Sequence, residues 1–291
     1  MRFDGGGVGG YAPLDTFFSA AIPGASLPSA AIERIKAPVA GVDLEVRTAG
    51  SGSRTILFLH PGDGLEGDNA ALAELAGSHR VIAPSHPGFG ESALPDHYRH
   101  IDDLAYYYLD FLEERKLERV AVVGVSFGAW IAAEIAIKNA SRIAGLVLAD
   151  AVGAKFEGPT VREITDIFSY PMYEHPDWLY ADPARRKMKF GDHADDVLMR
   201  LARNYESFAL FGWSPTLHDP RLAKRLHRIK VPTQFLWGAE DRIVTPAYGR
   251  KFAASIAGAG FELIAGAGHL PHVEKPREFA AAVGRFVAAL P

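Results

Sequence analysis

The sequence predicts an α/β fold, in which a mostly parallel sheet of eight strands has helices on both faces and a helical cap inserted into it. Three observations predict this fold. Short runs bounded by turn residues recur along the chain, and they are apolar on both faces, as strands in a buried parallel sheet are. Helical segments separate most of these runs, which indicates βαβ connections. The alternation stops over residues 153–229, which carry helical patterns but no strand pattern.

The first two predicted strands form a hairpin around Ala40 and Gly41, and the other six are the compact apolar runs. The eight strands are expected at residues 32–39, 42–48, 55–59, 80–84, 120–125, 146–149, 233–237 and 261–264. Helices are expected at 70–76, 102–116 and 129–139, and helical pieces of the cap near 160–168, 192–211 and 220–228.

These patterns divide the chain into three parts. Residues 1–30 are expected to form a flexible arm, 31–152 together with 230–291 the α/β core, and 153–229 the helical cap. Gly5, Gly7 and Gly10 fit the G-x-G-x-x-G dinucleotide pattern, but too few residues precede them for the strand that this pattern requires. No cofactor is therefore predicted, and the role of the Gly-rich arm stays open.

Composition narrows the function classes. The 291 residues include 31 basic and 35 acidic ones and no dense basic run, which argues against nucleic acid or an anionic membrane as the main partner. A small, nearly neutral substrate fits better. The absence of cysteine excludes thiol nucleophiles and thiolate metal sites. His97, His100 and the acidic cluster at 192–196 are expected to be solvated surface, so no metal is predicted.

Two further expectations concern location and assembly. No run of about 18 uncharged apolar residues occurs, so no membrane-spanning helix is predicted. The N-terminus lacks the build of a signal peptide, which makes a cytoplasmic location the default expectation. The oligomeric state stays open, with a homodimer among the alternatives.

A serine stands on a predicted strand-to-helix turn. The run G-V-S-F-G at 124–128 lies directly between the strand at 120–125 and the following helix. So tight a turn requires Gly124 and Gly128, because a Cβ at either position would collide with the crossing backbone. The turn exposes the Ser126 hydroxyl at the helix N-terminus, where free N–H groups favour developing negative charge.

A serine hydroxyl needs a base to take its proton, and the base needs an acid to orient it. His269 follows the last predicted strand and is the best-placed base, with His272 as a nearby alternative. Asp241 follows the preceding strand and is the preferred acid. Its competitors are the adjacent Glu240 and the more distant Asp150, at the end of an earlier strand.

Together these residues resemble the α/β-hydrolase fold enzymes over roughly residues 32–291. Further similar stretches are L-H-P-G at 59–62, H-P-G-F-G-E-S at 86–92 and G-H-L-P-H-V-E-K-P at 268–276. The resemblance implies an oxyanion hole made by the Phe127 N–H and a second N–H from the His60 loop. Because Pro61 has no N–H, the second donor is expected at Gly62, with Asp63 as the fallback. His60 itself is interpreted as structural.

Together these expectations predict that the protein is a serine hydrolase that acts on a small, largely apolar carboxylic ester through an acyl-enzyme. The residues expected to line the substrate pocket are Asp63, Phe168, Tyr205, Trp213 and Leu270. Two alternatives remain open. C–C hydrolases of aromatic degradation also resemble this sequence, although Val125 stands where they usually have Asn and Leu270 where they usually have Trp. Some members of the fold are small-molecule receptors. The identity of the substrate cannot be deduced from the motifs.

Overall fold

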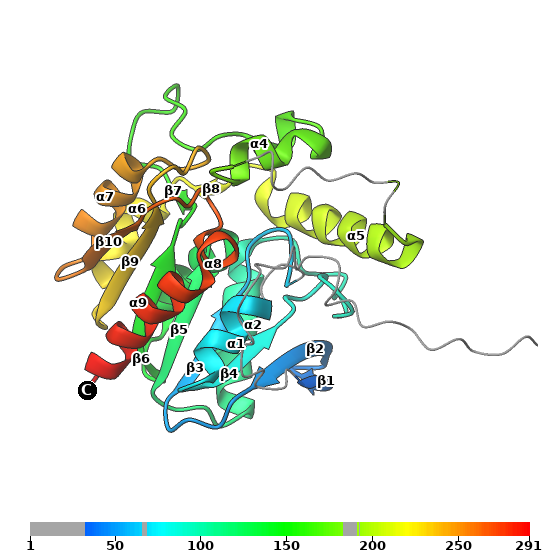
Figure 1. Cartoon of the computed structure of the whole chain (residues 1–291), viewed down its shortest axis with the longest axis vertical. Helices are drawn as coiled ribbons and strands as arrows, with labels where there is room; N and C mark the ends of the chain where they lie inside the picture. The colour runs from blue at the N-terminus through cyan, green and yellow to red at the C-terminus, as the bar shows by residue number, and fades with distance from the viewer. Residues whose placement is uncertain (1–32, 66–68, 183–190, 192) are drawn as a thin grey trace, which may run out of the picture.

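The structure is a computed structural model, and it describes residues 33–65, 69–182, 191 and 193–291 (Figure 1). The predicted arm at 1–30, its glycine pattern and Asp192 of the acidic cluster lie outside the described residues.

A sheet of eight strands forms the centre of the molecule, as the sequence predicted. The strand order is β1-β2-β4-β3-β5-β6-β9-β10. β1 and β2 form an antiparallel hairpin that turns at Ala40 and Gly41, β2 is antiparallel to β4, and the remaining pairs are parallel. The strands are β1 (Glu33–Val39), β2 (Val42–Ala49), β3 (Thr55–Leu59), β4 (Arg80–Pro84), β5 (Val120–Val125), β6 (Ile143–Ala149), β9 (Thr233–Gly238) and β10 (Gly260–Ile264).

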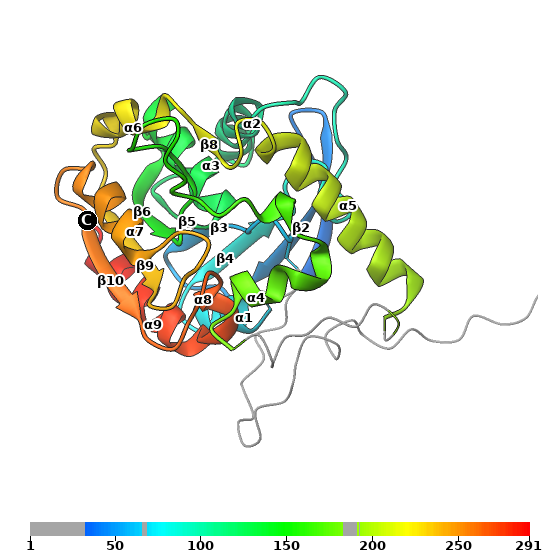
Figure 2. The ribbon, with the colours of Figure 1, turned by 90° about the horizontal axis from the view of Figure 1, so that it is seen from above.

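Helices cover both faces of the sheet (Figure 2). One face packs against α2 (Ile101–Glu114), α3 (Phe127–Lys138) and α7 (Pro246–Ala254), and the other against α1 (Asn69–Ala76), α8 (Pro271–Glu274) and α9 (Pro276–Ala289). In β5, Val120 and Val122 belong to the first core cluster, and Val123 and Val125 to the second. A strand buried on both faces is the reason that the central runs are apolar throughout.

An insertion lies between β6 and β9. It contains α4 (His175–Leu179) and α5 (Asp195–Gly212), which lie above the sheet in Figure 1. The two-residue strands β7 (Gly153–Ala154) and β8 (His218–Asp219) pair in parallel at its two ends, a feature that the sequence pattern did not predict. α6 (Leu222–Arg225) differs from these cap elements, because Leu222 is fully buried in the core cluster that also contains α3.

The prediction of a helix near residues 160–168 was wrong. This stretch consists of turns followed by a 3₁₀ turn at Ile167–Ser169. Thr165 explains the difference, because its N–H donates to the Ile243 carbonyl (2.8 Å) and its hydroxyl donates to the Arg242 carbonyl (2.8 Å). Bonds to a distant loop replace the local bonds of a helix.

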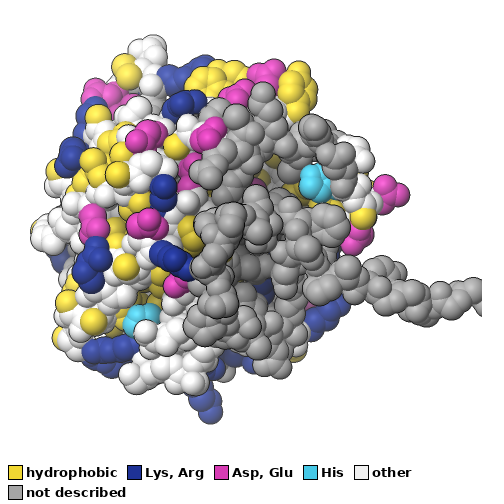
Figure 3. Space-filling model, in the orientation of Figure 1, with side chains coloured by type: hydrophobic (Ala, Val, Ile, Leu, Met, Phe, Trp, Pro, Cys, Tyr) yellow, Lys and Arg dark blue, Asp and Glu magenta, His cyan; other side chains and the backbone are white. Residues whose placement is uncertain are grey.

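The surface carries charges of both signs. On the face seen in Figure 3, basic and acidic side chains are interspersed with hydrophobic ones and do not gather into a patch of one sign. Among the described residues, no helix is both long and apolar enough to cross a bilayer.

Candidate active site

Ser126 occupies a strained turn between β5 and α3. Its φ is 52° and its ψ is −111°, a backbone conformation that a non-glycine residue rarely adopts. A Cβ on Gly124 would lie 2.5 Å from the Gly128 carbonyl oxygen, and a Cβ on Gly128 would lie 2.1 Å from the Leu59 carbonyl oxygen. Both glycines are therefore needed for α3 to cross so close to β3 and β5.

His269 connects Ser126 to Asp241. The Ser126 hydroxyl lies 2.7 Å from the imidazole Nε2, and the imidazole Nδ1 lies 2.9 Å from Asp241 Oδ2. Because a carboxylate accepts only, Nδ1–H donates to Asp241, which leaves Nε2 as the acceptor for the serine hydroxyl. All three side chains are buried. The structure thus joins the three residues that the sequence singled out.

Asp241 is held by its own loop. Its Oδ1 accepts the backbone N–H groups of Ile243 (2.8 Å) and Val244 (3.1 Å), so that three donors surround the carboxylate when His269 is counted. Such donors stabilise the ionised form. The alternative acid Glu240 is exposed, and the alternative base His272 packs between the rings of Phe58 and Phe279.

Asp150, the third acid considered, lies close to both Asp241 and His269. One carboxylate oxygen of Asp150, one carboxylate oxygen of Asp241 and one ring nitrogen of His269 lie within 4.8 Å of one another. Asp150 Oδ1 accepts the Gly238 N–H (2.8 Å). Burial, and next the nearby Asp241 carboxylate, raise the pKa of Asp150 well above its ordinary value.

Two backbone N–H groups near Ser126 are available to an acceptor. Within the described part of the chain, neither the Phe127 N–H nor the Gly62 N–H has a hydrogen-bond partner. The Phe127 group is free because it opens α3. The Gly62 group belongs to a turn in which the Gly64 N–H donates to the Pro61 carbonyl (3.2 Å). The carbonyl of Asp63, the fallback, accepts the Asn204 side-chain amide (2.9 Å).

A buried pair of histidines supports the Gly62 turn. His60 Nε2 accepts the His86 backbone N–H (2.9 Å), so its Nδ1–H donates to the Pro61 carbonyl (2.7 Å). His86 Nε2–H donates to the His60 carbonyl (3.0 Å), and His86 Nδ1 accepts from the Tyr108 hydroxyl (2.5 Å). Burial lowers the pKa of His86 to about 3 and also lowers that of His60 well below its ordinary value. Both rings are therefore neutral, and the expectation that His60 is structural agrees with these contacts.

Aromatic side chains of the insertion extend away from the Ser126 turn. The Phe168 ring lies 5.9 Å from that of Tyr205 and 5.5 Å from that of Trp213, which is 60% exposed. Phe208, which the sequence analysis missed, links this group to the turn: its ring lies 4.9 Å from Phe168 and 5.4 Å from Phe127.

Phe208 also covers Gly62. A Cβ on Gly62 would lie 2.6 Å from the Phe208 ring, so the ring lies directly on the predicted donor loop. Leu270, another predicted pocket residue, is 1% exposed beside His269. Asp63, by contrast, is exposed.

α5 also supports a second loop through polar residues that the sequence analysis missed. Asn204 Oδ1 accepts the Gly90 N–H (2.8 Å), and the Ser207 hydroxyl donates to the Gly88 carbonyl (2.7 Å). Together with Phe208 and Phe211 these side chains have spacings of three, four and seven residues, which mark one face of a helix. That spacing was the available signal.

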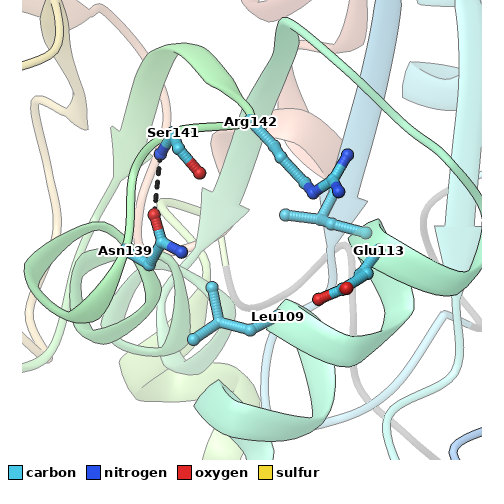
Figure 4. Close-up of a pocket in the computed structure, with 6 residues that line it drawn as sticks. Leu109, Glu113, Asn139, Ser141 and Arg142 are labelled. Atoms are coloured by element: carbon cyan, nitrogen blue, oxygen red, sulfur yellow. Dashed lines mark hydrogen bonds between the residues drawn. The ribbon is translucent and has the colours of Figure 1, made fainter.

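A separate surface pocket lies at the other end of α3 (Figure 4). Its lining residues are Leu109, Leu112, Glu113, Asn139, Ser141 and Arg142. Asn139 directly follows α3, whereas Ser126 precedes it, so about 18 Å of helix separates this pocket from the serine. It takes no part in the site.

Comparisons with known proteins agree with this architecture. A sequence model of the alpha/beta hydrolase family matches residues 56–282. The dihydrolipoyllysine-residue acetyltransferase component of an acetoin cleaving system from Cupriavidus necator is 29% identical over 84% of this chain, and the chain spans 66% of that relative. The 2-hydroxymuconate semialdehyde hydrolase of a Pseudomonas strain is 27% identical over 86% of this chain and 92% of its own length.

Solved structures show the same fold. A bacterial membrane phospholipase A described as a virulence factor superposes with a TM-score of 0.74 at 22% identity, over 90% of this chain and 87% of its own. At this identity the likeness concerns the fold alone.

Proposed function

Since the chain belongs to the alpha/beta hydrolase family, we propose that it is a serine hydrolase that cleaves a small, largely apolar carboxylic ester through an acyl-enzyme. The observation that carries the proposal is the continuous path of hydrogen bonds from the Ser126 hydroxyl through His269 to Asp241. A serine with a buried base and a buried acid in line is the arrangement that acyl transfer requires.

The proposed reaction has two steps. His269 Nε2 takes the hydroxyl proton while the Ser126 oxygen attacks the ester carbonyl, and Asp241 stabilises the resulting imidazolium. His269 then returns the proton to the leaving alcohol. In the second step His269 deprotonates a water molecule that attacks the acyl-enzyme carbonyl. His269 then returns this proton to the Ser126 oxygen as its bond to the acyl group breaks, which releases the acid and restores the serine hydroxyl.

The N–H groups of Phe127 and Gly62 are the proposed donors to the tetrahedral oxyanion. Both groups lack a partner among the described residues, and the His60–His86 pair restrains the Gly62 turn. Each preorganised donor of this kind is worth about 3 kcal/mol of transition-state stabilisation.

The aromatic side chains favour an apolar substrate. Phe127, Phe208 and Phe168 form a continuous set of ring contacts that begins beside Ser126 and leads into the insertion. Such rings bury apolar acyl or alcohol groups and offer no fixed charge to an ionic substrate. We therefore place Phe168, Tyr205 and Phe208 along the substrate path.

A C–C hydrolase acting on a ring-cleavage product is the second candidate. The similarity to 2-hydroxymuconate semialdehyde hydrolase over 92% of that protein favours it. Val125 and Leu270 count against it, since both stand where those enzymes usually have other residues.

Three measurements test these proposals: hydrolysis of an ester, labelling by a fluorophosphonate probe, and turnover of a ring-cleavage dienone. The wild-type protein is expected to hydrolyse a short-chain p-nitrophenyl ester, and Ser126→Ala is expected to lose that activity with its melting temperature unchanged. A fluorophosphonate probe should label wild-type protein only. Faster turnover of a ring-cleavage dienone than of every ester would favour the C–C hydrolase. Folded protein that neither reacts with the probe nor hydrolyses either substrate would contradict the hydrolase proposal and favour a small-molecule receptor.

A further inference from the structure

Asp150 is a buried carboxyl group for which the proposed reaction has no use. It follows β6 at a φ of 44°, and it is completely buried. Its Oδ1 accepts the Gly238 N–H, while its Oδ2 has no hydrogen-bond partner among the described residues. An unpartnered oxygen of a buried carboxylate would be strongly unfavourable.

A proton resolves this problem. Two adjacent buried carboxyl groups cannot both ionise without strong repulsion, so one of them keeps its proton. Asp241 accepts the N–H groups of Ile243 and Val244 and of the His269 ring, whereas Asp150 accepts one N–H group. Donors stabilise the charged form, so the negative charge belongs on Asp241 and the proton on Asp150.

We propose that Asp150 is protonated at neutral pH and donates its Oδ2 proton to the Asp241 carboxylate, which makes it a positioning residue for His269. This inference rests on the proposed function of Ser126, His269 and Asp241. The closeness of the three side chains supports the proposal, because a carboxylate oxygen of Asp150, one of Asp241 and a ring nitrogen of His269 lie within 4.8 Å of one another.

The surroundings of Asp150 favour the protonated form. Burial and the Asp241 charge raise its pKa, and the more distant Glu274 acts in the same direction. Only the Gly238 N–H opposes them. The imidazole of His269 already gives its Nδ1–H to Asp241, so it is not a donor to Asp150.

The added donor has a consequence for His269. A fourth hydrogen bond to Asp241 disperses its charge and fixes its rotamer, so that Asp241 stabilises an imidazolium less strongly and in one geometry only. Loss of this donor should move the acid limb of the pH profile of kcat/KM to higher pH. An ionised Asp150 would have the opposite signature, because its removal would take away a negative charge and move the limb to lower pH.

Asp150→Asn and Asp150→Ala form the matched test. The amide of Asn can accept from Gly238 and donate to Asp241, so Asp150→Asn should retain most of the activity, with the acid limb unmoved. In Asp150→Ala the rotamer of Asp241 is no longer fixed, so we expect kcat to fall about tenfold because His269 is oriented less well. The charge of Asp241 is also no longer dispersed, so we expect the acid limb to move up by about half a pH unit. A downward shift in Asp150→Asn, or an unchanged profile in Asp150→Ala, would overturn the proposal.

A readout without activity separates this proposal from the proposed function. Infrared difference spectra of wild type against Asp150→Asn at pH 7 should contain the carbonyl band of a protonated carboxyl group in the wild type. This band needs only folded protein, so it also serves if Asp150→Ala does not fold or if the ester assay fails. Absence of the band would show that Asp150 is ionised and would refute the proposal.

Discussion

The backbone carbonyl of Leu179, at the end of α4, accepts the backbone N–H of His269 over 2.8 Å. A residue of the insertion thereby holds the residue that contacts Ser126. The approach is close, because a Cβ on Gly268 would lie 2.7 Å from the same carbonyl oxygen. The position of His269 therefore depends on the insertion as well as on the core.

Glu274 strengthens this junction, and its loss should displace His269. Its Oε2 accepts the Gly268 N–H (2.6 Å) and its Oε1 accepts the Ala181 N–H (2.9 Å). Glu274→Ala should lower the free energy of unfolding by about 1–3 kcal/mol, because two partly buried N–H donors lose their acceptor. It should also lower kcat for an ester, because His269 is displaced. Glu278→Ala, one turn later and exposed, is the control and should cost less than about 1 kcal/mol. Equal effects in the two variants would contradict the role of Glu274.

Gly128→Ala should destabilise the fold. The new Cβ would lie 2.1 Å from the Leu59 carbonyl oxygen, so α3 and β3 would have to separate. Overpacking of this kind costs about 1–3 kcal/mol, which thermal or urea unfolding would detect. Gly158→Ala is the control, because no atom other than those of Gly158 and its two chain neighbours lies within 4 Å of the added Cβ. That variant should unfold like the wild type or slightly later.

Phe208→Ala should widen the range of acyl groups accepted. The ring lies on Gly62 and Phe127, so its removal opens space above the two proposed oxyanion donors. We expect the ratio of kcat/KM for a hexanoyl over an acetyl p-nitrophenyl ester to rise at least about tenfold. Leu210→Ala, on the same helix but 37% exposed, should leave the ratio as it is. An unchanged ratio in Phe208→Ala would place the acyl group elsewhere.

The buried His86 should make stability fall in acid. Its pKa is lowered to about 3, so this residue is neutral in the folded protein at a pH where it is protonated in the unfolded chain. The contribution of neutral His86 to the free energy of unfolding is complete above the ordinary histidine pKa of about 6.5. This contribution is lost as the pH falls towards 3, at up to about 1.4 kcal/mol per pH unit.

Urea unfolding between pH 7 and pH 4 measures that slope. His86→Gln should reduce this slope by the contribution of one proton, which is up to about 1.4 kcal/mol per pH unit. The variant is also expected to be less stable than the wild type at pH 7, because it loses the side-chain hydrogen bonds to His60 and Tyr108. The exposed His97→Gln serves as the control. The same slope in wild type and His86→Gln would refute this source of acid sensitivity.

Local patterns were sufficient to predict much of the fold. The predicted strands at 55–59, 80–84 and 120–125 coincide with β3, β4 and β5, because a strand buried on both faces is apolar at every position. The pattern failed at 160–168, where hydrogen bonds from Thr165 to the distant Arg242 and Ile243 replace a helix. Such bonds leave no local periodicity.

The sequence by itself determined which residue would stand on the tight turn, since only glycines at 124 and 128 allow α3 to cross there. It also supplied a histidine and three acids at the ends of strands or in the loops that follow them. Only the tertiary structure decided among the acids: Asp241 forms a hydrogen bond with His269, Glu240 is exposed, and Asp150 lies near both Asp241 and His269 but accepts the Gly238 N–H. It likewise brought Phe208 onto Gly62. The physical reason is that a hydrogen bond or ring contact between loops depends on how separate strands and helices pack, and spacing along the chain does not specify that packing.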